Sequence, residues 1–350
     1  MFLDMSRKRT RHRIDVKESE VEAVKDFLSH HRALQDECEQ VGIPLESVNH
    51  YWYKGQNFSI HAKGETFDLQ SWGEDIIKEV KKHAPTYKKI KRTNSKNARL
   101  LVISPADVHI GKLSSAFETG KEYNQEIAIK RALDGVKGIL NEVGDKKIDQ
   151  ILFIAGNDIL HTDTTKRTTT SGTPQDTDGS WFENYMKAQK LYIDILEMLV
   201  TVADVHFLHT MSNHDFMSGF FLAQSIEAFF SGNKNITFDC SPKPRKYYRY
   251  HNCLLGFSHG DGNKTADIPN LMAIEAKEDW SKVDHRWFFT GHIHHKQAKD
   301  FIGVCWESLR SPSESDSWHQ KKGYTGAPKA IEGFLFHKQY GQTNRISYFF

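Results

Sequence analysis

Short apolar runs separated by longer mixed segments dominate the chain from residue 100 onward. Continuous apolar runs are typical of buried strands, and they occupy residues 100–104, 151–155, 205–208, 254–258 and 287–290. Residues 125–144 and about 181–200 carry apolar side chains near helical spacing, which predicts two long helices. Strands that alternate with helices predict an α/β fold. Two later runs, 333–336 and 346–349, are expected to finish the second sheet.

The N-terminal part of the chain has a different pattern. A capping-box pattern at Ser19 predicts one helix, and Pro44 suits the start of a second helix, from Leu45 to about Tyr53. The alternating stretches 58–60 and 66–69 predict a hairpin. We therefore expect four parts: a flexible basic arm (1–17), a small helix-turn-helix domain with a wing (18–76), a basic linker (77–99) and a main domain (100–350).

Composition changes this picture little. The apolar fraction is 38% and the charged fraction 26%, as in ordinary globular proteins. The four cysteines form no C-x-x-C pair, which favours reduced thiols over a zinc knuckle or a disulfide framework. No apolar stretch is long enough to span a membrane, and no apolar signal segment follows the basic N-terminus. A cytoplasmic protein is the expectation.

Basic residues cluster although the net charge is only +2. Two short segments are candidates for phosphate contacts: Lys88, Lys89, Lys91 and Arg92 in the linker, and Lys166 and Arg167 in a polar insert at 162–180. The insert has no apolar periodicity and is expected to be a long loop beside the site. A merely solvated linker is an equally good explanation of the first cluster.

Metal-binding side chains follow the five predicted strands of the main domain. They are Asp107, His109, Asp158, Asn213, His259, His292 and His294. A single buried histidine is more often a core residue than a ligand, but five such segments in order make that reading improbable. One divalent ion takes four to six ligands, so this set suits two ions that share one carboxylate.

The order of these motifs (D-x-H, G-D, G-N-H, H, G-H-x-H) over residues 100 to 310 resembles the calcineurin-like metallophosphoesterase superfamily. The resemblance implies a four-layer sandwich of two mixed sheets flanked by helices. It also implies that Asp107, His109 and His294 hold one ion, that Asn213, His259 and His292 hold the other, and that Asp158 bridges them. Two positions depart from the pattern: Asn157 separates Gly156 from Asp158, and Ser212 replaces a glycine.

The ligand types and the resemblance together suggest the chemistry. Carboxylate, amide and imidazole ligands suit Mn²⁺ best, with Fe, Zn²⁺ or Mg²⁺ as alternatives. The resemblance gives His214 the role of binding the phosphate and protonating the leaving oxygen. His161 stands three residues after Asp158, where protein phosphatases usually have aspartate. This spacing resembles the nuclease branch that includes Mre11 and SbcD, in which this second histidine also faces the substrate.

Two enzyme classes remain open. The first is a nuclease that cleaves phosphodiester bonds in DNA during end processing, repair or recombination. The alternative is a small-molecule phosphatase or a cyclic-nucleotide phosphodiesterase, whose N-terminal domain serves oligomerisation or protein binding. A non-catalytic, metal-stabilised DNA-binding module is disfavoured, because binding alone needs no open two-metal centre. The sequence gives no indication of a protein partner or of the oligomeric state.

Overall fold

A computed structural model describes residues 97–350 without a break. It also describes residues 89–92, the strands β1 (His50–Lys54) and β2 (Ser59–Lys63), and the single residues Arg32, Gln35, Asp36, Cys38, Glu74 and Lys78. The chain divides into two compact units, Met1–Ser71 and Trp72–Phe350. No helix in the described part is long and apolar enough to cross a membrane.

The first unit contains an antiparallel pair of strands, β1 and β2. The helix expected from Leu45 to about Tyr53 is therefore wrong from His50 onward, because aromatic residues such as those at 51–53 favour strands. The described residues of the first predicted helix, Arg32, Gln35, Asp36 and Cys38, are helical. The basic arm, the stretch 66–69 and most of the linker lie outside the described residues.

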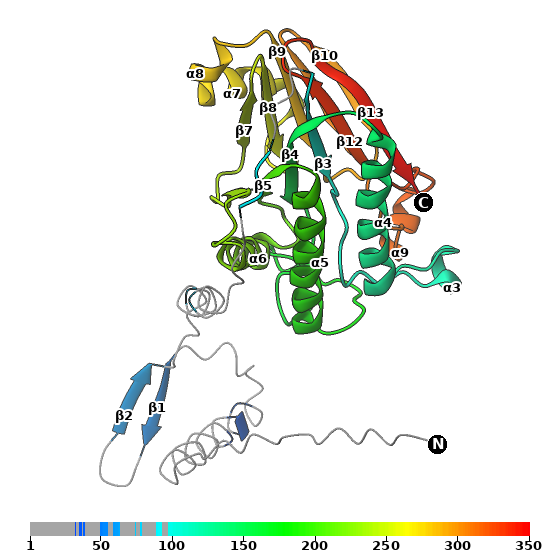
Figure 1. The fold of residues 1–350 in the computed structure, drawn as a ribbon. Coiled ribbons are helices and arrows are strands. Elements are labelled where there is room, and N and C mark those ends of the chain that lie inside the picture. The colour runs from blue at the N-terminus through cyan, green and yellow to red at the C-terminus, as the bar shows by residue number, and fades with distance from the viewer. Residues whose placement is uncertain are drawn as a thin grey trace, which may run out of the picture. The chain divides into compact units, whose positions relative to one another are not determined.

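The second unit is built on a six-stranded sheet (Figure 1). Its order is β13-β12-β3-β4-β5-β6. Strands β3, β4, β5 and β6 run parallel, whereas β12 is antiparallel to β3. The bounds are β3 (Arg99–Ser104), β4 (Ile148–Gly156), β5 (Asp204–Thr210), β6 (Ile236–Asp239), β12 (Ala330–His337) and β13 (Gly341–Phe349). The C-terminal runs thus join the first sheet, and the expectation that they finish the second sheet is wrong.

A five-stranded sheet of order β10-β11-β9-β8-β7 forms the second layer. Its strands are β7 (Lys246–Tyr250), β8 (Cys253–Ser258), β9 (His285–Thr290), β10 (Gln297–Phe301) and β11 (Val304–Ser308). This sheet is also mixed, because β8, β9 and β11 are parallel while β7 and β10 are antiparallel to their neighbours. Phe289 and Phe334 join the two sheets with ring centroids 4.6 Å apart. The predicted pair of mixed sheets flanked by helices is confirmed.

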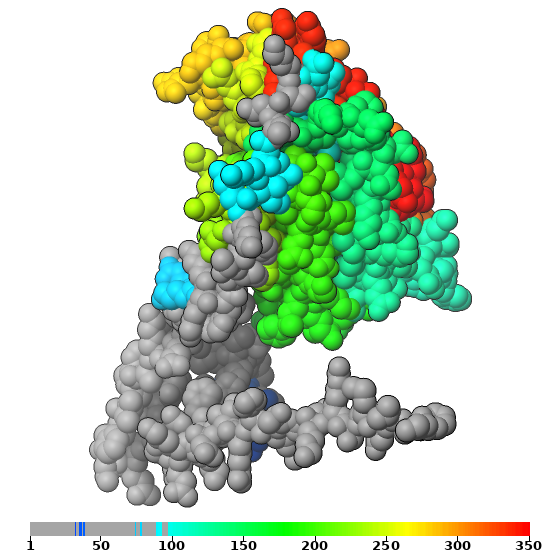
Figure 2. Space-filling view, viewed as in Figure 1, coloured from blue at the N-terminus to red at the C-terminus, as the bar shows by residue number. Residues whose placement is uncertain are grey.

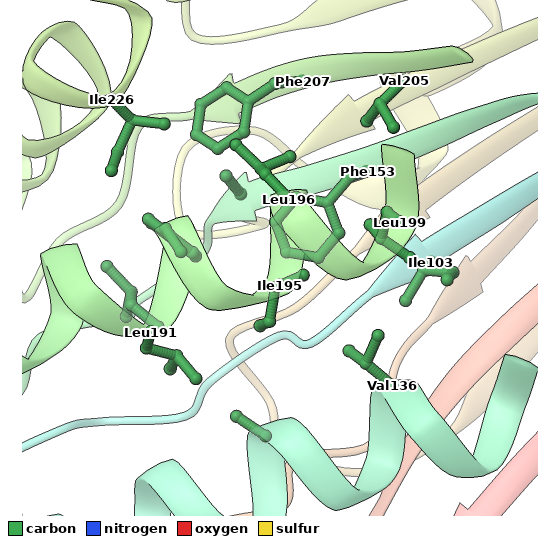
Figure 3. Close-up of a cluster of buried hydrophobic side chains, with 14 of the residues drawn as sticks. Ile103, Val136, Phe153, Leu191, Ile195, Leu196, Leu199, Val205, Phe207 and Ile226 are labelled. Carbon is green, nitrogen blue, oxygen red and sulfur yellow. The ribbon is translucent and has the colours of Figure 1, made fainter. Parts of the chain in front are cut away.

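Three long helices pack against the six-stranded sheet: α4 (Gln125–Val143), α5 (Trp181–Val202) and α6 (Phe216–Phe229). Figure 3 shows Leu196 and Leu199 of α5 near Phe153 and Phe207 of the sheet. Figure 2 shows α4 and α5 side by side on one surface of this unit. The remaining helices between residues 97 and 350 are short: α3 (Ala116–Thr119), α7 (Ile268–Glu275), α8 (Lys277–Trp280), α9 (Ser317–Lys322) and the 3-10 turn η2 (Thr265–Asp267).

Candidate metal centre

The loops after five strands carry the predicted ligands. Strands β3, β4 and β5 are parallel neighbours, so their carboxyl ends meet at one edge of the sheet. Strands β8 and β9 of the other sheet end at the remaining ligands. The two sheets are tied together here, because the backbone N–H of His292 donates to both carboxylate oxygens of Asp107, each at 3.0 Å. The structure therefore brings all seven predicted ligands into one region.

Backbone strain is concentrated in these loops. Of the eight non-glycine residues with positive φ in the described chain, six are in the motifs: Asp107, His109, Asn157, Asp158, His292 and His294. Such conformations disfavour L-residues and persist where the surrounding structure holds them. Gly156 (φ 79°) is required for the same reason, since a Cβ there would lie 2.0 Å from the carbonyl oxygen of Thr210. The strain points to a backbone shaped for ligand geometry.

The first ligand group consists of Asp107, His109 and His294. The Nε2 atoms of His109 and His294 lie 3.1 Å apart, and Nε2 of His294 lies 3.6 Å from an oxygen of Asp107. Asp107 and His109 are almost fully buried, with exposed fractions of 0% and 1%. Donor atoms this close are spaced as expected around one ion with bonds of about 2.0–2.2 Å.

The second ligand group consists of Asn213, His259 and His292. Nε2 of His259 lies 2.8 Å from the side-chain oxygen of Asn213 and 3.1 Å from Nδ1 of His292. Asp158 stands between the groups, because its Oδ2 atom is 3.2 Å from Nε2 of His259 and 3.8 Å from Nε2 of His109. The converging nitrogen and oxygen atoms fit two divalent ions, and the candidate groups in the described chain contain no cysteine.

Electrostatics favour a cation at this place. Burial raises the pKa of Asp107 to about 7. Burial also acts to raise the pKa of Asp158, but the nearby His259 and His214 outweigh it and lower the pKa. Burial would lower the pKa of His259, yet the charge of Asp158 raises it to about 9. Without a metal, the buried carboxylates thus draw positive charge onto His259, and a divalent cation would supply that charge instead.

The two predicted catalytic histidines lie together beside the first group. The rings of His161 and His214 are stacked with centroids 5.3 Å apart. Nδ1 of His214 lies 2.8 Å from the backbone oxygen of His161, and a carbonyl only accepts, so this nitrogen carries the proton and Nε2 is the remaining ring nitrogen. The backbone N–H of His214 donates to Asp158 at 3.0 Å. His214 is therefore fixed at both its backbone and its ring.

His161 contacts a ligand directly. Its Nδ1 atom lies 3.2 Å from Nδ1 of His109, whose Nε2 faces the other donor atoms. An imidazole that ligates through Nε2 keeps its proton on Nδ1 and donates it to a neighbour. Burial lowers the pKa of both His109 and His161, which keeps both rings neutral and suits this arrangement. This contact is compatible with a positioning role of His161 towards His109, beside the catalytic role predicted from the sequence.

The two departures from the family pattern have local explanations. Ser212 accepts a hydrogen bond from the backbone of Asp158 (2.9 Å) and donates one to Asp215 (2.5 Å). Its hydroxyl therefore supports the backbone at Asp158, which a glycine could not do. Asn157 adopts positive φ, which asparagine tolerates better than most residues, and its backbone oxygen accepts from Asp107 at 2.7 Å. Its side-chain oxygen is buried without a partner among the described residues.

Two further residues support the ligand loops, and the first of them was missed from the sequence. Ser311 donates to the backbone oxygen of Asp107 at 2.7 Å from a position 204 residues later. Asp215 holds the loop after β4, since its carboxylate accepts from the backbone of Leu160 at 2.9 Å. Burial raises the pKa of Asp215 to about 7. The run of serines at 308–317 is the one visible signal for the first of these contacts.

The predicted phosphate-contacting residues lie outside the ligand groups. Arg92 is paired with Asp204 at 3.3 Å and bonds backbone oxygens at the end of α5, so its guanidinium has a structural role. Lys89, Lys91, Lys166 and Arg167 are exposed. Residues 89–92 are among the cyan atoms beside α5 in Figure 2. Lys88 lies outside the described residues.

A cleft of about 380 Å³ opens beside the second ligand group. Its lining includes Asn213, the exposed ring of Phe216, and the loop 260–263 that follows His259. Thr170 and Ser171 of the insert form another wall. The predicted loop at 162–180 therefore lies beside the site, as expected, and contributes to the space in front of one ligand.

No protein-family model and no curated protein matches this sequence. Among solved structures, an archaeal phosphodiesterase is 9% identical, with 71% of this chain and 99% of that chain covered and a TM-score of 0.35. Zinc-bound Vps29 from Entamoeba histolytica is 13% identical (71% and 98% covered, TM-score 0.30). A predicted phosphoesterase from Streptococcus pneumoniae is 10% identical (72% and 99% covered, TM-score 0.29). Similarities this distant carry no argument about the activity, which has to be inferred from the site.

Proposed function

We propose that this protein is a two-metal phosphoesterase that cleaves phosphodiester bonds in nucleic acid, most directly DNA. The observation that carries the proposal is the place of Asp158, whose Oδ2 atom faces a histidine of each ligand group at 3.8 and 3.2 Å. One carboxylate between two sets of ligands is the arrangement that two-metal hydrolases use. Ions bound there supply Lewis-acid activation of water and phosphate.

The chain's own residues supply the rest of the chemistry. Because Nδ1 of His214 is bonded to a backbone oxygen, its other nitrogen, Nε2, can deliver a proton to the leaving oxygen when the ring is charged. The ring lies 4.7 Å from that of His109, so the acid stands beside the first ligand group. Asp107, His109 and Asp158 remain buried, which keeps water from competing with their ligation.

Nucleic acid is favoured as substrate by the Asp158-x-x-His161 spacing, which resembles the Mre11 and SbcD branch. The exposed Lys166 and Arg167 in the insert also suit a polyanion. The cleft of about 380 Å³ beside Asn213 favours a second candidate, a small phosphodiester such as a cyclic nucleotide. The two candidates differ in the substrate that the enzyme requires: the first needs a polynucleotide, whereas the second hydrolyses a small phosphodiester.

The test is Mn²⁺-dependent cleavage of single- and double-stranded DNA, run in parallel with a small chromogenic phosphodiester. We expect the wild type to cut DNA and His214→Ala to lose at least about a hundredfold in rate. A matched control is His285→Ala, because this ring also bonds a backbone oxygen (Gln339, 3.0 Å) but stands at the opposite end of β9. Turnover of the small ester without cleavage of any polynucleotide would exclude the nuclease and favour the second candidate.

A further inference from the structure

Helix α9 contacts the first ligand group through a histidine that the proposed chemistry does not use. The ring of His319 is stacked on that of His294, with centroids 5.4 Å apart and an interplanar angle of 20°. His294 is a member of the first ligand group. Whatever binds to the outer surface of α9 is therefore held close to the metal centre.

The helix is held in place by buried polar contacts. Asp316 caps its N-terminus by accepting from the backbone of His319 at 2.9 Å, and it pairs with the fully buried Lys112 at 3.1 Å. Gln320 donates to the backbone oxygen of Thr119 at the end of α3, which lies beside α9 in Figure 1. A buried lysine requires such a partner. The helix is thus a fixed element of the unit.

The outer surface of α9 is aromatic. Trp318 is 56% exposed and Tyr324, just after the helix, is 63% exposed. Their ring centroids are 5.8 Å apart. Large exposed rings contribute little to folding, and paired ones next to an active site are typical of surfaces that stack ligands.

The same surface has excess positive charge. Between residues 311 and 329 the acids are Glu314 and Asp316, and both are paired with cations, Arg131 at 2.7 Å and Lys112. Lys321 and Lys322 are exposed in the last turn of α9. The neighbouring segment 116–122 carries Glu118, Lys121 and Glu122, a net charge of −1, so the excess positive charge belongs to α9 itself. Lysines beside exposed rings suit a ligand that alternates phosphates with flat bases.

We propose that α9 and Tyr324 bind single-stranded nucleic acid and guide it to the metal centre. Trp318 stacks on an unpaired base, and Lys321 and Lys322 contact the adjacent phosphates. A duplex would not offer its base faces to these rings, so the occupant is single-stranded. The inference rests on the proposed nuclease function and deepens it by naming the form of the substrate.

The experiment measures binding separately from cleavage. A fluorescent oligothymidine is titrated with the metal-free full chain, and its anisotropy is followed over a range of salt concentrations. Trp318→Ala should weaken affinity about fivefold or more, and Trp318→Phe should keep most of it. Lys321→Ala/Lys322→Ala should lower the slope of log affinity against log salt by about 1.4, at about 0.7 per lost phosphate contact on a single strand. Exposed lysines elsewhere, in Lys277→Ala/Lys282→Ala, serve as the control and should leave the slope unchanged.

The outcomes separate this inference from the proposed function. If Trp318→Ala binds within twofold of the wild type and the double lysine variant keeps its salt slope, the α9 surface is not the binding site, even when DNA is cleaved. If binding depends on α9 but no polynucleotide is cleaved with Mn²⁺, the α9 inference stands and the nuclease function fails. For cleavage itself, the loss that Trp318→Ala causes on single-stranded DNA must exceed its loss on the small ester.

Discussion

The two ligand groups of the centre differ in how they are enclosed. Around the first, Asp107 and His109 are buried, His161 lies against His109, and His319 of α9 covers His294. Beside the second, Asn213 borders a cleft of about 380 Å³. The difference predicts that the first side retains its ion more tightly, whereas the cleft leaves more room beside the second side.

The two sides also have different neighbours in the chain. Ser311, near the C-terminus, supports Asp107 of the first side. The insert at 162–180 borders the second side through Thr170 and is attached there by Asp163. Retention therefore depends on residues far apart in sequence, whereas access depends on one local loop. Substitutions among the ligands and supports of the first side should affect metal affinity, whereas substitutions in the insert should affect substrate affinity.

The largest effect is expected for Asp158, which belongs to both sides. Asp158→Asn removes the shared charge, so both ions should be held more weakly. We expect turnover to fall by at least about a thousandfold, which corresponds to about 4 kcal/mol. Metal content after gel filtration should fall together with the rate. Asp194→Asn, at a partly exposed position on α5, is the control. Near-native turnover of Asp158→Asn would show that the sides do not share this carboxylate.

On the first side, His161→Asn tests positioning against catalysis. Loss of the contact between His161 and His109, whose Nδ1 atoms are 3.2 Å apart, should weaken metal affinity about ten- to a hundredfold. Calorimetric titration with Mn²⁺ should show the loss in one of two binding steps. Unchanged metal affinity, combined with slower turnover at saturating metal, would assign His161 to the substrate instead.

The convergence of the candidate ligands was predictable, because each follows a continuous buried strand and that pattern is local. Helix α6 was not, since apolar residues such as Phe220, Phe221 and Leu222 surround its axis and hide the helical period. The contact of Ser311 with Asp107 spans 204 residues, and no local pattern reveals it. The sheet that β12 and β13 join could not be predicted either, because an apolar run does not specify which sheet edge it pairs with.

The strand that leads to the second side contains a pH-sensitive residue. His209 on β5 is buried, and neither ring nitrogen has a partner among the described residues. Burial lowers the pKa of His209 to about 3. Below about pH 6.5 this histidine is therefore protonated in the unfolded chain but stays neutral in the folded chain. Stability is therefore lost as the pH falls. In His209→Leu the decrease in unfolding free energy between pH 7 and pH 5 should shrink by about 2 kcal/mol.

Denaturant unfolding of the wild type and of His209→Leu at both pH values measures this difference. His206→Leu on the same strand should reduce the pH dependence less, because burial lowers the pKa of this ring too but it is only partly buried and has a partner in Thr237, at 2.8 Å. Equal pH dependence in the wild type and His209→Leu would mean that the buried ring titrates normally.

The smallest effect should come from the attachment of the insert. Asp163 accepts from the backbone of Ser218 at 2.7 Å and from that of Met217 at 3.2 Å, at the start of α6, where Asp215 makes no capping bond of its own. Asp163→Ala should cost about 1 kcal/mol of stability, as expected for a lost helix cap. Because the loop borders the cleft, KM should rise while kcat changes little.

Asp178 provides the matched control. It lies in the same insert and also accepts from a helix N-terminus, through Gln125 of α4 at 3.1 Å, but none of its contacts reaches the cleft. Asp178→Ala should therefore lose a similar amount of stability without a rise in KM. If both variants raise KM equally, the insert acts as one rigid piece. The cleft beside the second ligand group would then depend on the whole insert rather than on its attachment at α6.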